Sequence, residues 1–193
     1  MGDILLKEIS EQPSVIKRLF QEKKDLVESI SETILGKFDY IIIAARGTSD
    51  NAARYAQYLL GSINRIQVAL ATPSLFTIYD SPPNISKALV IGISQSGQSP
   101  DIVAVLQSAR KQGGKTLAIT NDANSPLANA ADYVIPLDTG KEEAVAATKT
   151  YTASLAALAL LSTKLCRNEV KYQELLTLPE KLSETIERTL NAI

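Results

Sequence analysis

Short apolar runs alternate with longer stretches of helical periodicity, and this alternation constrains the fold more than any other feature of the chain. The clearest run is Tyr40–Ala45 (YIIIAA), and a stretch typical of a helix follows over about 51–60. Continuous apolar runs of this length are typical of strands buried on both faces, and strands that alternate with helices pair in parallel through right-handed crossovers. The other predicted strands are 66–70, 88–93, 116–120 and 133–137.

The pattern predicts a doubly wound α/β fold, a three-layer α/β/α sandwich around a five-stranded parallel sheet. The remaining predicted helices are 4–34, 72–79, 100–111, 126–131, 143–165 and 171–191. We therefore divide the chain into an N-terminal helical segment (1–35), a central α/β domain (36–166) and a C-terminal helix (167–193).

Composition excludes several functions. The sequence has no histidine, so Ser-His-Asp and Cys-His nucleophiles and the commonest general base are absent. Its single cysteine, Cys166, forms no internal disulfide and fits a reducing compartment, so we expect a cytoplasmic protein. The 20 Lys and Arg balance 21 Asp and Glu, and aromatic residues make up 5%, which argues against a nucleic-acid surface. We also expect no membrane segment, because no apolar stretch is free of charge over a sufficient length.

Two polar loops follow predicted strands, at the sheet edge where doubly wound domains bind ligands. They are Arg46–Asp50 (RGTSD) and Ser94–Ser99 (SQSGQS). In the second loop, Ser99 suits a helix N-cap and Pro100 the first helical position, so hydroxyls and backbone N–H groups converge on a helix N-terminus. Gly97 allows a ligand to approach the backbone closely. The loop is therefore predicted to bind a phosphate or a similar anion.

The alternative interpretation is that such serines are ordinary helix caps. We prefer it for the pairs Thr72-Pro73 and Ser125-Pro126, whereas Ser94–Ser99 carries more hydroxyl and amide groups than one cap needs. Neither the G-x-G-x-x-G pattern nor the P-loop pattern occurs in the chain.

A third candidate segment precedes the longest apolar stretch. Glu142 and Glu143 are predicted in the first turn of a helix over 143–165, where the helix dipole favours acidic residues whatever the function. Lys149 is either a surface lysine or a site residue. Because the predicted helix is apolar on more faces than one sheet can cover, we expect part of it to pack against a second domain.

Four segments carry a resemblance to a known family: ARGTS (45–49), SQSGQSPD (94–101), LAITND (117–122) and VAATKTYTASLAALALL (145–161). In order and spacing they are similar to the SIS (sugar isomerase) domain family, which has a flavodoxin-like arrangement. The first half of the isomerase region of glucosamine-6-phosphate synthase and its relatives is especially similar, including the opening LLKEISEQPSVI (5–16).

The resemblance implies a phosphosugar site that needs neither a metal nor an organic cofactor. Many members have Glu-Thr where this chain has Gln98-Ser99, so the hydroxyl is retained and a carboxylate is missing. Glu142 and Lys149 are expected near the sugar. The residues implied to bind the phosphosugar are Gly47, Thr48, Ser49, Ser94, Gln95, Ser96, Gly97, Ser99 and, through its backbone, Val145.

The resemblance also implies that this is half of an enzyme. The similar proteins carry two SIS domains, and their catalytic glutamate, histidine and lysine lie in the second. We expect the N-terminal half of an isomerase or deaminase for glucosamine-6-phosphate or fructose-6-phosphate, partnered by a second SIS domain or by a second copy. Because Met1 stands just before this region, we expect no glutaminase domain ahead of it. The alternatives are a single-domain isomerase, which the lack of histidine disfavours, and a non-catalytic sugar-phosphate sensor.

Overall fold

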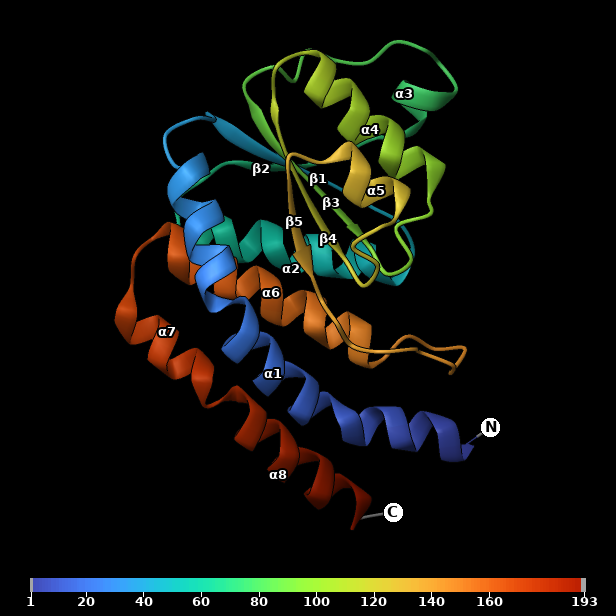
Figure 1. The fold of residues 1–193 in the computed structure, drawn as a ribbon, viewed down its shortest axis with the longest axis vertical. Coiled ribbons are helices and arrows are strands. Elements are labelled where there is room, and N and C mark those ends of the chain that lie inside the picture. The colour runs from blue at the N-terminus through green and yellow to red at the C-terminus, as the bar shows by residue number, and fades with distance from the viewer. Residues whose placement is uncertain (1, 192–193) are drawn as a thin grey trace.

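The computed structural model describes residues 2–191 and confirms the predicted fold class. A five-stranded parallel sheet lies between two layers of helices (Figure 1). The elements in chain order are α1 (Gly2–Ile34), β1 (Tyr40–Ala45), α2 (Thr48–Ile63), β2 (Val68–Leu70), α3 (Ser74–Thr77), β3 (Ala88–Ser94), α4 (Pro100–Lys111), β4 (Lys115–Thr120), α5 (Pro126–Ala130), β5 (Tyr133–Pro136), α6 (Lys149–Leu165), α7 (Glu169–Leu176) and α8 (Leu178–Leu190).

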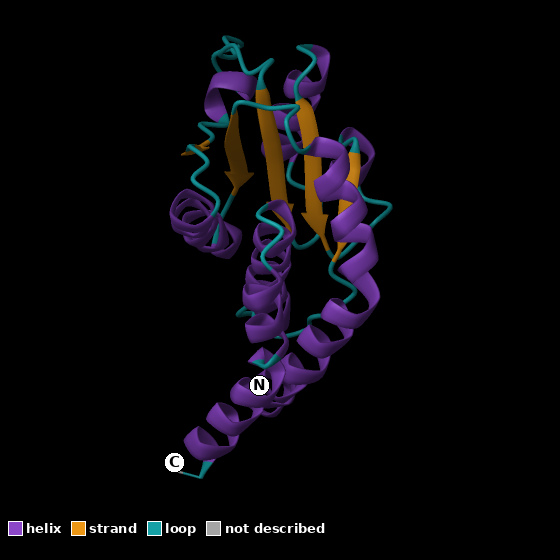
Figure 2. Ribbon diagram, turned by 90° about the vertical axis from the view of Figure 1, so that its left-hand side faces the viewer, coloured by secondary structure: helices purple, strands orange, loops and turns teal. Residues whose placement is uncertain are grey.

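The strand order is β2-β1-β3-β4-β5, so the order reverses between β1 and β3. From β1 the chain first crosses to β2 on one side, and it then returns to place β3 on the other. All neighbouring strands are parallel, and Figure 2 shows their arrowheads directed toward the same edge. In sheets of this kind, the loops that follow the two strands at the reversal form a crevice for ligands.

Both faces of the sheet are buried because side chains alternate between two apolar cores. In β1, Ile41 and Ile43 point into the core formed with α1, α2 and α6, whereas Ile42 and Ala44 point into the core formed with α4 and α5. β3 alternates in the same way, with Ile91 in the first core and Val90 in the second. The continuous apolar runs in the sequence are the direct consequence of this double burial.

The predicted helix over 143–165 is wrong at its N-terminus, because α6 begins only at Lys149. The backbone N–H groups of Glu143 and Ala144 donate to the carboxylate of Glu8, on α1, and residues 141–148 form no helical turn. Glu142 and Glu143 therefore lie in a loop after β5, and not in the first turn of a helix.

The predicted single helix over 171–191 is also wrong, because two helices occupy this stretch. Thr177 ends α7 and precedes α8 directly. Pro179 has no N–H group to continue a helix, and it suits a first turn. α8 packs alongside α1 (Figure 1).

Other helices of the same chain cover most of the surface of α6 that faces away from the sheet. This differs from the expectation that part of this surface packs against a second domain. α6 contacts α1, α2 and α7 as well as the sheet. What stays half-buried is a strip that includes Leu155 and Ala159, which lines a shallow apolar pocket with Tyr55 and Leu178. Although α6 is markedly apolar, no helix within residues 2–191 is both long and hydrophobic enough to cross a membrane.

We predict that Leu161→Ala destabilises the fold by about 2–5 kcal/mol, because Leu161 is fully buried in α6 and its loss leaves a cavity between helices and sheet. Urea unfolding followed by circular dichroism measures the change. The control is Val170→Ala, at a side chain that is 70% exposed on α7, where we expect a change below about 0.5 kcal/mol. Equal effects of the two substitutions would contradict the assignment of α6 to the core.

Candidate functional site

The sheet brings the two predicted polar loops together at the reversal of strand order. Ala45, the last residue of β1, pairs with Ile93 of β3, so the loops that follow these strands are neighbours. The Arg46 guanidinium forms an ion pair with the carboxylate of Asp101, in the first turn of α4. This contact ties the first loop to the helix that follows the second.

The first loop is shorter than predicted, because α2 starts at Thr48 rather than near 51. Gly47 precedes the helix with a φ of 59°, a conformation that glycine adopts readily. Thr48 is exposed and Ser49 is half-buried in the first turn, where the free N–H groups of the helix also lie. Both hydroxyls thus stand at the positive end of α2.

The second loop is held in place by bonds within it and to the neighbouring strand and helix. The Gly97 N–H donates to Ser94 Oγ at 3.1 Å, and the Gln98 N–H donates to Ser96 Oγ at 3.3 Å. Two further backbone bonds anchor it, from Asn121 N–H to the Gln95 carbonyl (3.0 Å) and from Leu127 N–H to the Gly97 carbonyl (3.1 Å). Ser96 remains exposed to solvent.

The two Ser-Pro pairs that begin helices, at 99–100 and 125–126, use their serines differently. Ser125 Oγ accepts a bond from the Ala128 N–H and caps α5, as predicted for an ordinary cap. Ser99 stands at the N-cap position of α4, with Pro100 directly behind it, but its side chain makes no capping bond. The Ser99 hydroxyl therefore does not cap the N-terminus of α4, and the interpretation as an ordinary cap does not account for it.

Gly97 is required at its position by its surroundings. Its φ is +63°, which strains any residue with a side chain, and an added Cβ would overlap the Ser125 side chain. The close approach of the loop to α5 therefore depends on this glycine.

The loop between β5 and α6, residues 137–148, borders the same edge of the sheet. Asn121 Oδ1 accepts from the Thr139 N–H at 2.8 Å, and Asn121 also bonds to Gln95, so this loop is connected to the Ser94–Ser99 loop. Val145, which is implied to line the sugar, is 94% exposed at the outer part of the loop.

Glu142 holds the C-terminal part of the 137–148 loop against the start of α6. One carboxylate oxygen accepts from the Thr148 N–H at 2.7 Å and from the Thr150 N–H at 3.3 Å. The other oxygen, Oε2, is buried and has no hydrogen-bond partner within the described part of the chain.

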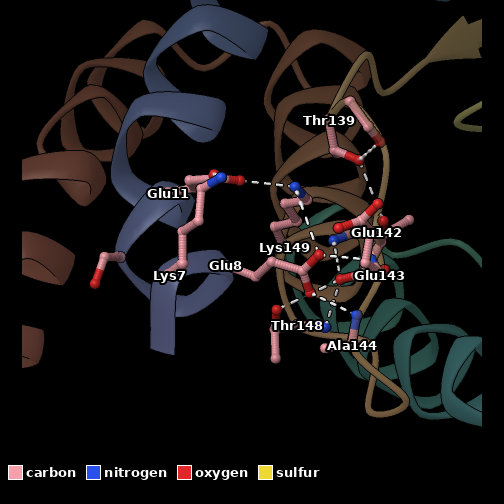
Figure 3. A network of polar contacts seen from close by, with 12 residues as sticks. Lys7, Glu8, Glu11, Thr139, Glu142, Glu143, Ala144, Thr148 and Lys149 are labelled. Atoms are coloured by element: carbon pink, nitrogen blue, oxygen red, sulfur yellow. Dashed lines mark hydrogen bonds and ion pairs between the residues drawn. The ribbon is translucent and has the colours of Figure 1, made fainter. Parts of the chain in front are cut away.

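Lys149 is buried, and two acidic side chains of α1 surround its ammonium group (Figure 3). Its Nζ lies 2.7 Å from Glu11 Oε2 and 3.9 Å from Glu8 Oε1. Of the two alternatives for Lys149, the surface lysine is therefore excluded, and the ammonium is paired with two carboxylates. The one signal of this pairing in the sequence is the spacing of three between Glu8 and Glu11, which places both on one face of a helix.

The exposed ion pair of Lys141 with Glu143 lies on the outside of the loop. The hydrogen bond from Lys141, together with its charge, holds the pKa of the Glu143 carboxyl below its ordinary value, and the same contact raises the pKa of Lys141. Glu143 is therefore a carboxylate at neutral pH.

Chemically, the site offers hydroxyl and backbone N–H donors at two helix N-termini and one exposed guanidinium, which is paired with Asp101. The Glu142 Oε2 in the neighbouring loop, which has no hydrogen-bond partner among the described residues, is buried. Among residues 2–191 there is no group of three or more acidic, cysteine or histidine side chains placed to hold a metal. A parallel sheet with this strand order, and polar loops where the order reverses, defines a flavodoxin-like doubly wound domain, a class in which ligands bind at the carboxyl ends of the strands.

The chain belongs to the SIS domain family, whose sequence pattern matches residues 34–164. The resemblance inferred from the four segments is thereby confirmed. α1 lies ahead of the matched segment, and α7 and α8 lie beyond it.

Several known proteins are similar to most of the chain. The glutamine–fructose-6-phosphate aminotransferase (isomerizing) of Geobacillus kaustophilus is 41% identical over 164 residues, which cover 82% of this chain and 27% of that protein. A solved structure from Silicibacter pomeroyi, assigned as a phosphosugar isomerase, is 33% identical with a TM-score of 0.91 and is covered to 56%, against 94% of this chain. The C-terminal domain of glucosamine-fructose-6-phosphate aminotransferase from Francisella tularensis is 27% identical with a TM-score of 0.76, over 95% of this chain and 53% of that one. The chain thus spans little more than a quarter of the aminotransferase and about half of each solved structure.

We predict that Gly97→Ala destabilises the protein by more than about 1 kcal/mol, because it adds backbone strain and an overlap with Ser125. The matched control is Gly36→Ala, whose φ of +76° imposes similar strain but whose added Cβ meets no atom within 4 Å. The difference between the two midpoints of thermal unfolding then reports the contact of the loop with α5. A larger loss in Gly36→Ala would refute this packing.

Proposed function

We propose that this domain binds a sugar phosphate at the carboxyl edge of its sheet. The observation that carries the proposal is the Ser94–Ser99 loop, which presents hydroxyl groups beside a helix N-terminus without using Ser99 to cap that helix. A phosphate is recognised by donors of this kind, and the positive end of α4 favours its charge.

Within this proposal, the phosphate is bound by the side chains and N–H groups of the Ser94–Ser99 loop, with the first turn of α2 contributing beside it. The proposed phosphosugar contacts are Gly47, Thr48, Ser49, Ser94, Gln95, Ser96, Gly97, Ser99 and the backbone at Val145. Glu142 is proposed near the sugar because it lies in the loop that precedes α6, at the carboxyl edge of the sheet; its Oε2 is buried, so a sugar hydroxyl reaches it only if this loop moves. Lys149 is left out of the contacts, because Glu8 and Glu11 engage its ammonium group.

The names of the relatives favour a phosphosugar as the ligand. They are fructose-6-phosphate aminotransferases and a protein assigned as a phosphosugar isomerase. We propose that the chain is the N-terminal half of an isomerase or deaminase for fructose-6-phosphate or glucosamine-6-phosphate, because it covers only part of each relative. The partner proposed is a second SIS domain or a second copy of the chain, and the free Cys166 fits a cytoplasmic location.

Ser96→Ala is predicted to weaken the binding of fructose-6-phosphate by about 1–2 kcal/mol, the contribution of one hydrogen bond to a charged group. Isothermal titration calorimetry measures the affinity. Stability is expected to change little, since Ser96 is exposed. The control is Ser86→Ala, an exposed serine just before the opposite end of β3, which should leave the affinity unchanged. Unchanged affinity in Ser96→Ala would contradict the proposed contact between Ser96 and the phosphate.

We also predict that this chain binds its ligand without turning it over. Proton transfer between two sugar carbons needs a positioned base and acid, and here histidine is absent and Lys149 is engaged by acidic side chains. A coupled assay for fructose-6-phosphate formed from glucose-6-phosphate or glucosamine-6-phosphate is expected to give no signal above background. Appreciable turnover by the purified chain that Glu142→Gln abolishes would instead favour a single-domain isomerase.

A further inference from the structure

Helix α1 contributes a buried carboxylate to the candidate site, although most of the helix lies ahead of the segment that matches the SIS family. Glu8 is only 3% exposed, far below the usual exposure of a glutamate. A buried carboxylate is costly unless it is paired and hydrogen-bonded. The partners of Glu8 therefore indicate what it does.

Glu8 uses both of its oxygens on the loop that precedes α6 (Figure 3). Oε1 accepts from the Glu143 N–H at 2.6 Å, and Oε2 is 3.3 Å from the Ala144 nitrogen, which also donates to it. Lys149 lies 3.9 Å away and supplies the opposite charge. Bonds from backbone N–H groups to a charged acceptor are strong, so this one side chain fixes the segment directly before Val145.

The loop fixed in this way continues to the proposed phosphate site through a chain of hydrogen bonds. Thr139, at the start of the loop, donates its N–H to Asn121, and Asn121 donates its own N–H to the Gln95 carbonyl. At the other end of the loop, Glu142 accepts hydrogen bonds from the N–H groups of Thr148 and Thr150, at the start of α6. Glu8, which lies outside the SIS segment, binds the middle of this loop through the N–H groups of Glu143 and Ala144.

We propose that Glu8 is a positioning residue for phosphosugar binding: it orders residues 142–145, so that α1 is part of the sugar subsite. The inference rests on the proposed function. Glu8 is expected to affect the sugar and phosphate contacts differently, because the Ser94–Ser99 loop has its own hydrogen bonds to Asn121 and Leu127. Loss of Glu8 is expected to weaken contacts to the sugar and to leave those to the phosphate.

A second ion pair between the same two helices provides a matched control. Lys164 of α6 pairs with Glu28 of α1 at 3.1 Å, far along both helices from the loop. Glu28→Gln therefore removes a contact between α1 and α6 without touching residues 142–145. Glu8→Gln removes the charge with little change in shape, and Lys149 keeps Glu11 at 2.7 Å, so the chain is expected to remain folded.

The experiment compares Glu8→Gln, Glu28→Gln and the unmodified chain by NMR titration with fructose-6-phosphate and, separately, with inorganic phosphate. In Glu8→Gln the affinity for fructose-6-phosphate is expected to fall about tenfold, equivalent to ~1.4 kcal/mol, while that for inorganic phosphate stays within about twofold. Glu28→Gln is expected to change neither affinity. Equal losses for both ligands, or no loss for either, would overturn the positioning role.

Amide hydrogen exchange tests the same role without a ligand. The amides of Glu143 and Ala144 are expected to exchange at least about tenfold faster in Glu8→Gln than in Glu28→Gln, because their acceptor is weakened. Unchanged exchange there refutes the inference. If Glu8→Gln does not fold, Glu8→Asp gives the same test: it keeps a negative charge near Lys149 but is one methylene too short for both amides. If the unmodified chain binds phosphate but no sugar phosphate, the proposed function fails, and the exchange result still decides whether Glu8 orders the loop.

Discussion

The parallel sheet must be buried on both faces, and this requirement determines where the rest of the chain can go. Its strands carry apolar side chains toward both helical layers, so neither face can hold polar chemistry. The remaining place is the edge at which the strands end. There the reversal of strand order separates the crossovers and leaves the loops after β1 and β3 side by side. The proposed site is thus a consequence of the sheet, and its residue types only select the ligand.

Local patterns predicted the elements that local interactions define. Tyr40–Ala45 and Pro100–Lys111 have the predicted bounds, because a continuous apolar run and a Ser-Pro start are complete signals in themselves. The polar loops after β1 and β3 were predicted on the same basis. The start of α6 was not, because the small and apolar residues of 144–147 suit a helix, whereas the structure has a loop there that is bonded to Glu8, which is distant in the sequence.

Contacts between distant residues account for what the sequence could not predict about the site. Glu8 and Glu143 are 135 positions apart, and nothing near Lys149 announces that it is buried beside two carboxylates. The Ser-Pro pairs at the starts of α4 and α5 illustrate the same limit, since both suit a cap and only Ser125 makes one. Sequence patterns identify which groups are present, whereas the packing of α1 against α6 decides which of them are already engaged.

The placement of the two terminal helices has a consequence for how such a domain sits within a longer polypeptide. α1 begins and α8 ends on the same side of the molecule, beyond the strand ends that carry the loops (Figures 1 and 2). A domain joined to either helix by a short tether therefore lies on the side of the molecule that carries those loops. Its effective concentration there rises as the tether shortens toward the span it must cross. Groups on a domain tethered in this way would then meet these loops as an intramolecular event, without a high intrinsic affinity between the two domains.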